Sequence, residues 1–270
     1  MIFSVIIPCY NSSAYLKDCL ESFLNSKFKT NEFEVILVND GSNDDTLIKL
    51  NYFNDNYSFI KVLSQKRNGV SSARNLGVEN SMGKFILFLD SDDKFSTNIF
   101  EELNDQIKKI DFEILEFGYK FKNRKQIKVK NQDKPQNGYN HYLSNSQSNS
   151  VCNKLYKKSF LVSNKLFFDK KFKIGEDLLF NLFAMASAKR VVCLSKTLLL
   201  INDGNDNSVT RKKSLLTEKQ IITDLYEIFK ITSLKISDKN SNIEKRYYIK
   251  HSNRIMMTLL FRELKIYVLY

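Results

Sequence analysis

Acidic side chains dominate the residues of this chain that could carry out chemistry. The sequence Asp90-Ser91-Asp92-Asp93 follows the apolar run Phe85–Leu89, and two of its carboxylates, Asp90 and Asp92, fall on the same side of an extended turn. Mg²⁺ and Mn²⁺ prefer such hard oxygen ligands and often bridge from them to substrate phosphates. The pattern indicates a divalent metal site, with a turn that caps the next helix near Ser96 as the alternative.

Two further acidic patterns lie where a strand ends or a helix begins. Asn39-Asp40-Gly41-Ser42 follows the apolar run 34–38, and Gly175-Glu176-Asp177 opens a predicted helix. A carboxylate at a helix N-terminus is favoured in its ionised form, which is the form a general base needs. The alternative is that Glu176 and Asp177 only complement the helix dipole.

Other residue types give little support for other chemistry. The chain has only two histidines, His141 and His251, and no glycine-rich phosphate or dinucleotide loop follows any predicted strand. The cysteines are too far apart in the sequence for a zinc site or a disulfide framework, so we expect them to be reduced and buried. Carboxylates must therefore carry any polar chemistry. The four cysteines are Cys9, Cys19, Cys152 and Cys193.

The elements that must position these acids repeat as strand, loop and helix through about the first 90 residues. This alternation predicts an α/β fold with a doubly wound, mostly parallel sheet, flanked by helices, whose ligands bind at the carboxyl ends of the strands. The acidic loops lie at those ends. The predicted strands are Ile2–Ile7, Glu34–Val38, Ile60–Leu63 and Phe85–Leu89.

The rest of the chain has a weaker pattern. After a strand at 112–117, the polar stretch 120–150 is interpreted as loop with some irregular strand. A helix from Gly175 and a strand pair at 190–194 and 197–201 follow. Two amphipathic helices, at about 214–231 and 243–264, form a predicted helical extension at the C-terminal end.

Charge is divided unevenly along the 270 residues, whose formal net charge is +12. Residues 1–110 carry −3, residues 111–210 carry +8 and residues 211–270 carry +7. The basic part suggests an anionic partner, such as nucleic acid or a membrane surface, with a solvated lysine-rich surface as the alternative. No apolar run reaches the ~20 residues of a spanning helix, and the N-terminus lacks the pattern of a signal peptide. We therefore expect a cytoplasmic protein.

Five segments in this order and spacing resemble family 2 glycosyltransferases of the GT-A fold, of bacterial type. The resemblance covers about residues 1–205 and does not extend to the last sixty or so residues. The five segments are Ser4–Asn11, Val38–Asp44, Asn68–Asn75, Phe88–Asp93 and Gly175–Asp177.

The resemblance implies transfer of a sugar, with inversion, from a nucleotide diphosphate sugar, usually a UDP-sugar, to an acceptor hydroxyl. It implies a Mn²⁺ or Mg²⁺ cofactor and a glycan or lipid-linked glycan acceptor. In bacteria this family most often builds surface polysaccharide or lipopolysaccharide. The rival hypotheses are a catalytically silent nucleotide-sugar-binding relative, a nucleotidyltransferase on a similar sheet, and a basic nucleic-acid-binding protein. The last is disfavoured because charge alone supports only non-specific binding.

The resemblance also assigns roles to particular residues. Tyr10 stacks on the base, Asp40 accepts from the uracil N–H, and Arg74 lies near the diphosphate. Asp92 is the metal ligand, and Asp90 contacts the ribose or sugar. Asp177 is the general base, and Glu176 supports the acceptor. The nucleotide-sugar-binding set is Pro8, Tyr10, Asn11, Asp40, Arg74, Asp90 and Ser91.

These assignments predict three parts of the chain. Residues 1–110 form the nucleotide-binding half and residues 111–205 the acceptor half of one catalytic domain. Residues 206–270 form a basic, helical region that binds an anionic membrane surface or packs on the catalytic domain. Two departures from the family are Cys152, where members often carry Trp, and the segment around Ser208, where Arg211 and Lys212 could replace a phosphate clamp.

Overall fold

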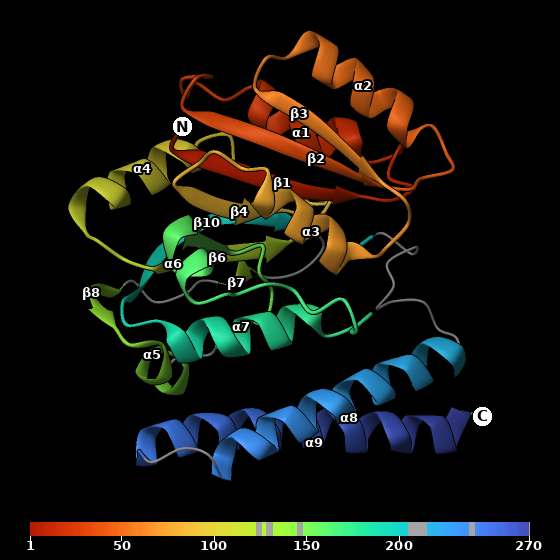
Figure 1. Ribbon diagram of the computed structural model, residues 1–270, viewed down its shortest axis with the longest axis vertical. Helices are drawn as coiled ribbons and strands as arrows, with labels where there is room; N and C mark the ends of the chain where they lie inside the picture. Colours follow the sequence, from red (N-terminus) through yellow and green to blue (C-terminus); the bar gives the residue numbers. More distant parts are fainter. Residues whose placement is uncertain (123–125, 128–131, 145–147, 205–214, 238–240, 270) are drawn as a thin grey trace.

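The predicted mixed α/β architecture is confirmed by a computed structural model of the chain (Figure 1). The structure describes residues 1–122, 126–127, 132–144, 148–204, 215–237 and 241–269. One ten-stranded sheet runs through the molecule in the order β3-β2-β1-β4-β9-β6-β10-β5, with β7 on β6 and β8 on β10. The segment with Ser208, Arg211 and Lys212 lies outside the described residues.

The first four strands are parallel and adjacent, as the strand and helix alternation predicts. Their side chains are mostly buried on both faces of the sheet because helices cover both, which explains the continuous apolar runs. The elements of this half are β1 (Phe3–Cys9), α1 (Leu16–Leu24), β2 (Phe33–Asp40), α2 (Thr46–Asn56), β3 (Ile60–Gln65), α3 (Val70–Glu79), β4 (Phe85–Phe88), β5 (Lys94–Phe95) and α4 (Ile99–Lys109).

The second half extends the same sheet with strands of mixed direction. β9 lies between β4 and β6 and is antiparallel to both, whereas β6 and β10 are parallel to each other. This arrangement brings the loops of the second half beside those of the first. The elements are β6 (Ile114–Phe121), β7 (Gln126–Ile127), β8 (Gln132–Gln136), α5 (Gly138–Ser144), β9 (Lys154–Lys157), α6 (Lys158–Ser163), α7 (Glu176–Ser187) and β10 (Val191–Ile201).

Two expectations for this half are wrong. The predicted strand pair is one long strand, β10, whose pairing with β6 shifts between Leu194 and Thr197. A bulge of this kind interrupts the apolar pattern without ending the strand. The stretch expected as loop contains the helix α5, which buries His141 and Tyr142 against the rest of the protein. Tertiary packing stabilises this helix, since its polar, short sequence would not.

A large aromatic-rich core holds most of the sheet and its helices together, and a smaller cluster packs Ile36 and Val38 of β2 against Ala73 of α3. The rings of Phe33 and Phe100 stack with centroids 4.4 Å apart, and Phe3 packs 5.2 Å from Phe100. The cysteines contribute to this interior, since all four are buried and unbridged, as expected. The close packing gives the loops at the strand ends a rigid base.

The helices α8 (Leu215–Ser237) and α9 (Asn242–Leu269) pack against each other and lie along α7 and α5, at the opposite end of the molecule from α2 and β3 (Figure 1). Their inner faces bury Ile221, Ile228, Tyr247 and Ile255. The described part of the chain contains no helix that is both long and apolar enough to cross a bilayer.

Candidate active site

Three loops from neighbouring parallel strands meet at one edge of the sheet, after β1, β2 and β4. In the first loop, Asn11 adopts a left-handed conformation with φ of 48°, which asparagine tolerates well. Its N–H donates to Ser42 Oγ at 3.1 Å, and its Oδ1 accepts from Asn43 N at 3.0 Å. The hydroxyls of Ser12 and Ser91 lie 2.7 Å apart and join the first loop to the third. The three loops therefore form one bonded surface.

An exposed aromatic ring lies on this surface. Tyr10 follows Pro8 and Cys9 at the end of β1, and the guanidinium of Arg67 lies 3.4 Å from the centre of its ring. Such a cation–π contact restrains the orientation of the ring. Sequence reasoning identified Tyr10 but missed Arg67, because the two residues come from loops far apart in the chain.

Asp40 is buried and is bonded by the loop after β3. Its Oδ1 accepts from Gln65 Nε2 at 2.7 Å and from Asn68 N at 2.8 Å, and its Oδ2 accepts from Gly69 N at 2.9 Å. Gly69 has φ of 90°, a conformation that favours glycine. Asp40 thus fixes the loop that leads into α3, and its carboxylate retains acceptor capacity on Oδ2.

The guanidinium of Arg74, on α3, joins the third loop to the start of α7. Its Nη2 donates to Asp90 Oδ1 at 2.9 Å, and its Nη1 donates to Asp177 Oδ1 at 2.7 Å and to Glu176 Oε1 at 3.1 Å. The side chain of Arg74 is only 3% exposed. The sequence placed Arg74 near a diphosphate and did not indicate these carboxylate partners.

Three carboxylates around one guanidinium leave an excess of negative charge. Removal from water raises the pKa of Asp177 to about 7, and although Arg74 lowers it, Glu176 and Asp90 raise it further. Burial disfavours the charged form of Arg74, but the attraction of Asp177 and the other two carboxylates raises its pKa well above the usual value. Burial and the neighbouring negative charges therefore raise the pKa of Asp177, which is opposite to the shift expected from its place at a helix N-terminus.

The third loop carries the oxygens that could bind a metal ion. Asp90 remains 43% exposed beside Arg74, and Asp92 is half-buried and lines a small cavity of about 110 Å³ together with Lys122. Asp93 is buried and accepts a hydrogen bond from Asn202 N at 2.8 Å. One or two carboxylates with substrate phosphates make the usual Mg²⁺ site, so Asp92 with Asp90 fits a divalent ion in its donor chemistry.

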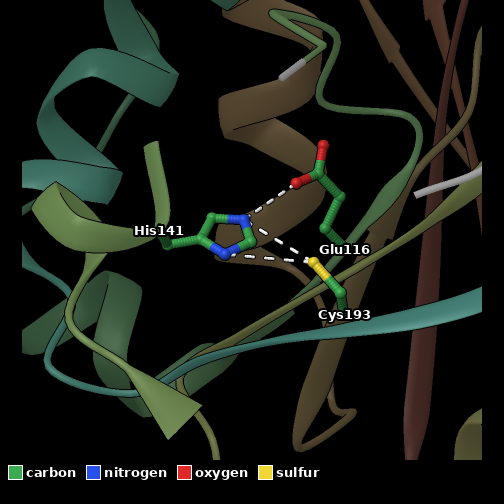
Figure 2. A group of neighbouring side chains, drawn as sticks. All are labelled: Glu116, His141 and Cys193. Atoms are coloured by element: carbon green, nitrogen blue, oxygen red, sulfur yellow. Dashed lines mark hydrogen bonds and ion pairs between the residues drawn. The ribbon is translucent and has the colours of Figure 1, made fainter. Parts of the chain in front are cut away.

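A second polar cluster lies inside the other half of the sheet (Figure 2). His141 Nε2 lies 3.0 Å from Glu116 Oε2 and 3.7 Å from Cys193 Sγ. The ammonium of Lys154 lies 3.5 Å from Glu116 Oε1, and all four side chains are buried. Sequence reasoning missed this cluster, because nothing in the spacing of its residues brings them together.

This cluster does not fit a metal ion well, although its three ligand atoms lie within 4.8 Å of one another. Burial raises the pKa of Cys193 to about 12, so the thiol keeps its proton, whereas zinc binds the thiolate. Lys154 and a hydrogen bond from His141 already hold the pKa of Glu116 low despite burial. A divalent ion would add positive charge beside a buried ammonium, so the cluster is a hydrogen-bonded network that ties α5 to β6 and β10.

Fold and site together define an α/β protein with carboxylates clustered where parallel strands end. The sequence profile of glycosyl transferase family 2 matches residues 4–192, and the chain belongs to this family.

Similar proteins of known sequence include one from Bacillus subtilis and one from Staphylococcus aureus. An uncharacterised glycosyltransferase of Bacillus subtilis, EpsJ, is 29% identical over 221 residues, which are 77% of this chain and 62% of EpsJ. The poly(ribitol-phosphate) beta-N-acetylglucosaminyltransferase TarS of Staphylococcus aureus strain Mu50 is 27% identical over 270 residues, which are 97% of this chain and 44% of TarS. The chain thus spans less than two thirds of the length of these relatives.

Solved structures confirm the predicted GT-A fold class. The crystal structure of S. aureus TarS residues 1–349 with UDP-GlcNAc matches 98% of this chain and 73% of that chain, with a TM-score of 0.72 and 24% identity. The mannosyltransferase PcManGT of Pyrobaculum calidifontis, in complex with GDP-Man and Mn²⁺, matches 99% of this chain and 75% of that chain, with a TM-score of 0.65 and 12% identity.

Proposed function

We propose that this chain transfers a sugar from a nucleotide diphosphate sugar, preferably a UDP-sugar, to a hydroxyl group of an acceptor. The observation that carries the proposal is the contact of one buried guanidinium, Arg74, with Asp90 after β4 and with Glu176 and Asp177 at the start of α7. This contact supports a single active site, in which the donor binds on the side of Asp90 and the acceptor on the side of Glu176 and Asp177. Membership of glycosyl transferase family 2 supports the same reaction.

The donor half binds the nucleotide in this proposal. Hydrogen bonds join the loops after β1, β2, β3 and β4 to one another. They support a preformed pocket, so that binding of the nucleotide costs little conformational entropy. Tyr10 stacks the base on the ring face that Arg67 leaves open, and Asp40 accepts from the base N–H. Arg74 faces the diphosphate while it fixes the acceptor-side acids. The remaining proposed contacts come from Pro8, Asn11, Asp90 and Ser91.

Asp92 is the proposed ligand of a Mn²⁺ or Mg²⁺ ion. When bound, the ion would offset the negative charge that develops on the departing diphosphate. The excess negative charge around Arg74 and the partial exposure of Asp92 support this role. The Mn²⁺ complex of PcManGT, whose fold is similar, is consistent with it.

The proposed chemistry is one displacement at the anomeric carbon. The acceptor oxygen forms the new C–O bond, the bond from that carbon to the UDP oxygen breaks, and UDP leaves with the electron pair. Asp177 takes the acceptor proton, and Glu176 positions the acceptor. A carboxylate whose pKa is raised to about 7 can exchange a proton near neutral pH, which supports this role. A single displacement inverts the anomeric configuration.

An anionic surface glycan is the proposed class of acceptor. TarS, by its name, acts on poly(ribitol-phosphate), and residues 111–210 and 211–270 of this chain carry +8 and +7. Positive charge attracts a polymer of phosphates and raises its local concentration. Lipopolysaccharide or another lipid-linked glycan of a bacterial surface would suit the same site.

The C-terminal helices could meet that acceptor at a membrane. The outer face of α9 leaves Arg246, Ile249 and Met257 exposed, and this mixture supports peripheral binding to the anionic cytoplasmic face of a bilayer. The buried inner faces of α8 and α9 support the packing alternative equally, and the two roles are compatible. Nucleic acid is not a partner in this proposal.

Ligand titration tests the proposal against its rivals. UDP and UDP-GlcNAc should raise the melting temperature, more strongly with Mn²⁺, because they bind the native state alone. NMR of the product should give the inverted anomer. A catalytically silent relative would bind without turnover, whereas a nucleic-acid-binding protein would be stabilised by RNA and not by UDP. Retention of configuration would contradict the single displacement.

A further inference from the structure

The C-terminal helix α8 bonds directly to the loop that carries the acceptor-side acids. The buried Asp224 accepts two backbone hydrogen bonds on one oxygen, from Lys173 N at 3.1 Å and from Ile174 N at 3.0 Å. Its other oxygen accepts from Gln220 Nε2, one turn earlier, at 2.8 Å. These two N–H groups come just before α7, so Asp224 is the hydrogen-bond partner of the backbone that leads to Glu176.

Gly175, between that bonded backbone and the acids, also contacts α8. Its φ of 85° is a conformation that favours glycine. A Cβ added there would lie 2.9 Å from Ile228 Cδ1 and 3.8 Å from Leu225 Cδ2, so the two helices fit closely at this point. The loop is therefore held by hydrogen bonds on one side and by apolar contact on the other.

The neighbouring helix α9 supports the body of α7. Tyr247 is fully buried, and its hydroxyl donates to Leu182 O of α7 at 2.8 Å. Arg254 Nη1 lies 3.4 Å from Asn149 Oδ1, and the backbone oxygen of Asn149 accepts from Asn181 Nδ2 of α7 at 2.6 Å. The pair of helices thus contacts both the start and the middle of α7.

We propose that Asp224 is a positioning residue for the reaction, and that the helices α8 and α9 belong functionally to the active site. Asp224 fixes the backbone at 173–174, and this places Glu176 and Asp177 against Arg74. The inference rests on the proposed function, because it gives the two acids the acceptor-side role. Misplacing a reacting group by about 1 Å can cost about 10²-fold in rate, so a distant hydrogen bond can control turnover.

The test compares Asp224→Ala with Asp224→Asn in the full chain. The probe is whichever of UDP-GlcNAc, UDP-glucose and UDP-galactose the wild type hydrolyses fastest with Mn²⁺, read as UDP release. Asp224→Ala should lower kcat by about 10- to 100-fold and leave KM within about twofold, since it displaces the acids and not the nucleotide pocket. Asp224→Asn should keep most of kcat, because its amide oxygen can still accept from both N–H groups.

Hydrogen exchange of the backbone amides in residues 169–178 gives a readout that does not depend on turnover. Asp224→Ala should speed exchange in this segment, and Asp224→Asn should not. Thr223→Ala is the matched control, since Thr223 is exposed on the same helix and bonds only within it among the described contacts. It should change neither kcat nor exchange.

The outcomes separate this inference from the proposed function. An unchanged kcat in Asp224→Ala, or equal losses in the Ala and Asn variants, would overturn the positioning role. If the wild type releases UDP from none of the three sugars, the proposed function fails, and exchange in residues 169–178 alone decides whether Asp224 orders the loop. Unchanged exchange in Asp224→Ala would then overturn the inference.

Discussion

The donor half and the acceptor half of the site differ in how their acids are held. Asp40 takes its partners from Gln65 at the end of β3 and from the loop that follows, and they fix its carboxylate before any ligand binds. Glu176 and Asp177 share Arg74, which lies 102 and 103 residues away in the chain and is also bonded to Asp90. In the proposed function, the first arrangement serves binding and the second serves proton transfer. Variants of the donor half should therefore change affinity, and variants of the acceptor half should change turnover.

The largest expected effect is that of Asp177→Asn. The amide keeps the shape of the side chain but cannot accept the acceptor proton, so kcat should fall by roughly 10²–10⁴-fold. UDP binding, measured by calorimetry, should persist because the donor half is untouched. Asp169→Asn is the matched control, as the same change on an exposed side chain. Near-normal turnover in Asp177→Asn would transfer the role of base to Glu176 or another group.

Asp92→Ala tests the donor half of the site. Removing the proposed metal ligand should abolish the gain in UDP-GlcNAc affinity that Mn²⁺ provides, a loss at least as large as the roughly 10- to 100-fold effect of removing an outer-shell partner. Calorimetry with and without Mn²⁺ measures it, with the exposed Asp55→Ala as control. The same Mn²⁺ dependence in Asp92→Ala and wild type would place the metal elsewhere.

The pH dependence of kcat/KM should reflect the excess of negative charge around Arg74 in the acceptor half. Because the pKa of Asp177 is raised to about 7, kcat/KM should rise about tenfold per pH unit below 7 and level off above it. Asp40→Asn, a change in the donor half, should leave this midpoint in place. The measurement is UDP release between pH 5.5 and 8.5. A midpoint near pH 4 would mean that Arg74 outweighs burial and the neighbouring acids.

The pH dependence of the free energy of unfolding should depend on His251, which lies on α9 between the rings of Tyr142 and Tyr247. Burial, together with the charges of Arg254 and Lys250, lowers the pKa of His251 to about 3. Below its ordinary pKa of 6.5 the unfolded chain takes up a proton that the folded chain does not, so this residue costs stability as pH falls from 6.5 towards 3.

The free energy of unfolding of His251→Phe should therefore rise relative to that of the wild type as pH falls, by up to about 1.4 kcal/mol per pH unit. Urea unfolding of both proteins at pH 7 and pH 5.5 measures the difference. Comparing them cancels the opposite contribution of Asp177, whose raised pKa favours the folded state at low pH. A difference that stays constant with pH would show that His251 has the same pKa in the folded and the unfolded protein.

The smallest expected effect concerns the outer face of α9. The full chain should sediment with anionic vesicles at low salt and be released at high salt. Arg246→Ala should weaken binding by about 1 kcal/mol, roughly fivefold, whereas Lys27→Ala in the donor half should not. Both side chains are exposed, so neither change should disturb the fold. Equal binding to neutral and anionic vesicles would mean that α9 serves only for packing.

Much of the donor half could be predicted because its signals are local. The buried run Phe85–Phe88 and the acids that follow it define β4 and its loop within a few residues, and β1 and β2 do the same for Tyr10 and Asp40. Parallel strands place their carboxyl ends at one edge, so the meeting of these loops followed from the order of the elements. The general character of the site was thus available from the sequence.

The acceptor half depended on contacts that no local pattern contains. The bulge in β10, the helix α5 and the cluster of Glu116 with His141 arise from packing between distant segments. The same holds for the link from Asp224 to the loop before α7. Burial and the sum of neighbouring charges exist only in the folded chain.

The sequence by itself determined which residues could act, since it set the acids at the ends of apolar runs and at the start of a helix. Only the tertiary structure decided how they act. It brought Arg74 to Asp90 and Asp177, and burial of Asp177, together with the negative charges of Glu176 and Asp90 nearby, raised its pKa to about 7. The physical reason is that a charge depends on its distance to other charges and to water, and folding sets both.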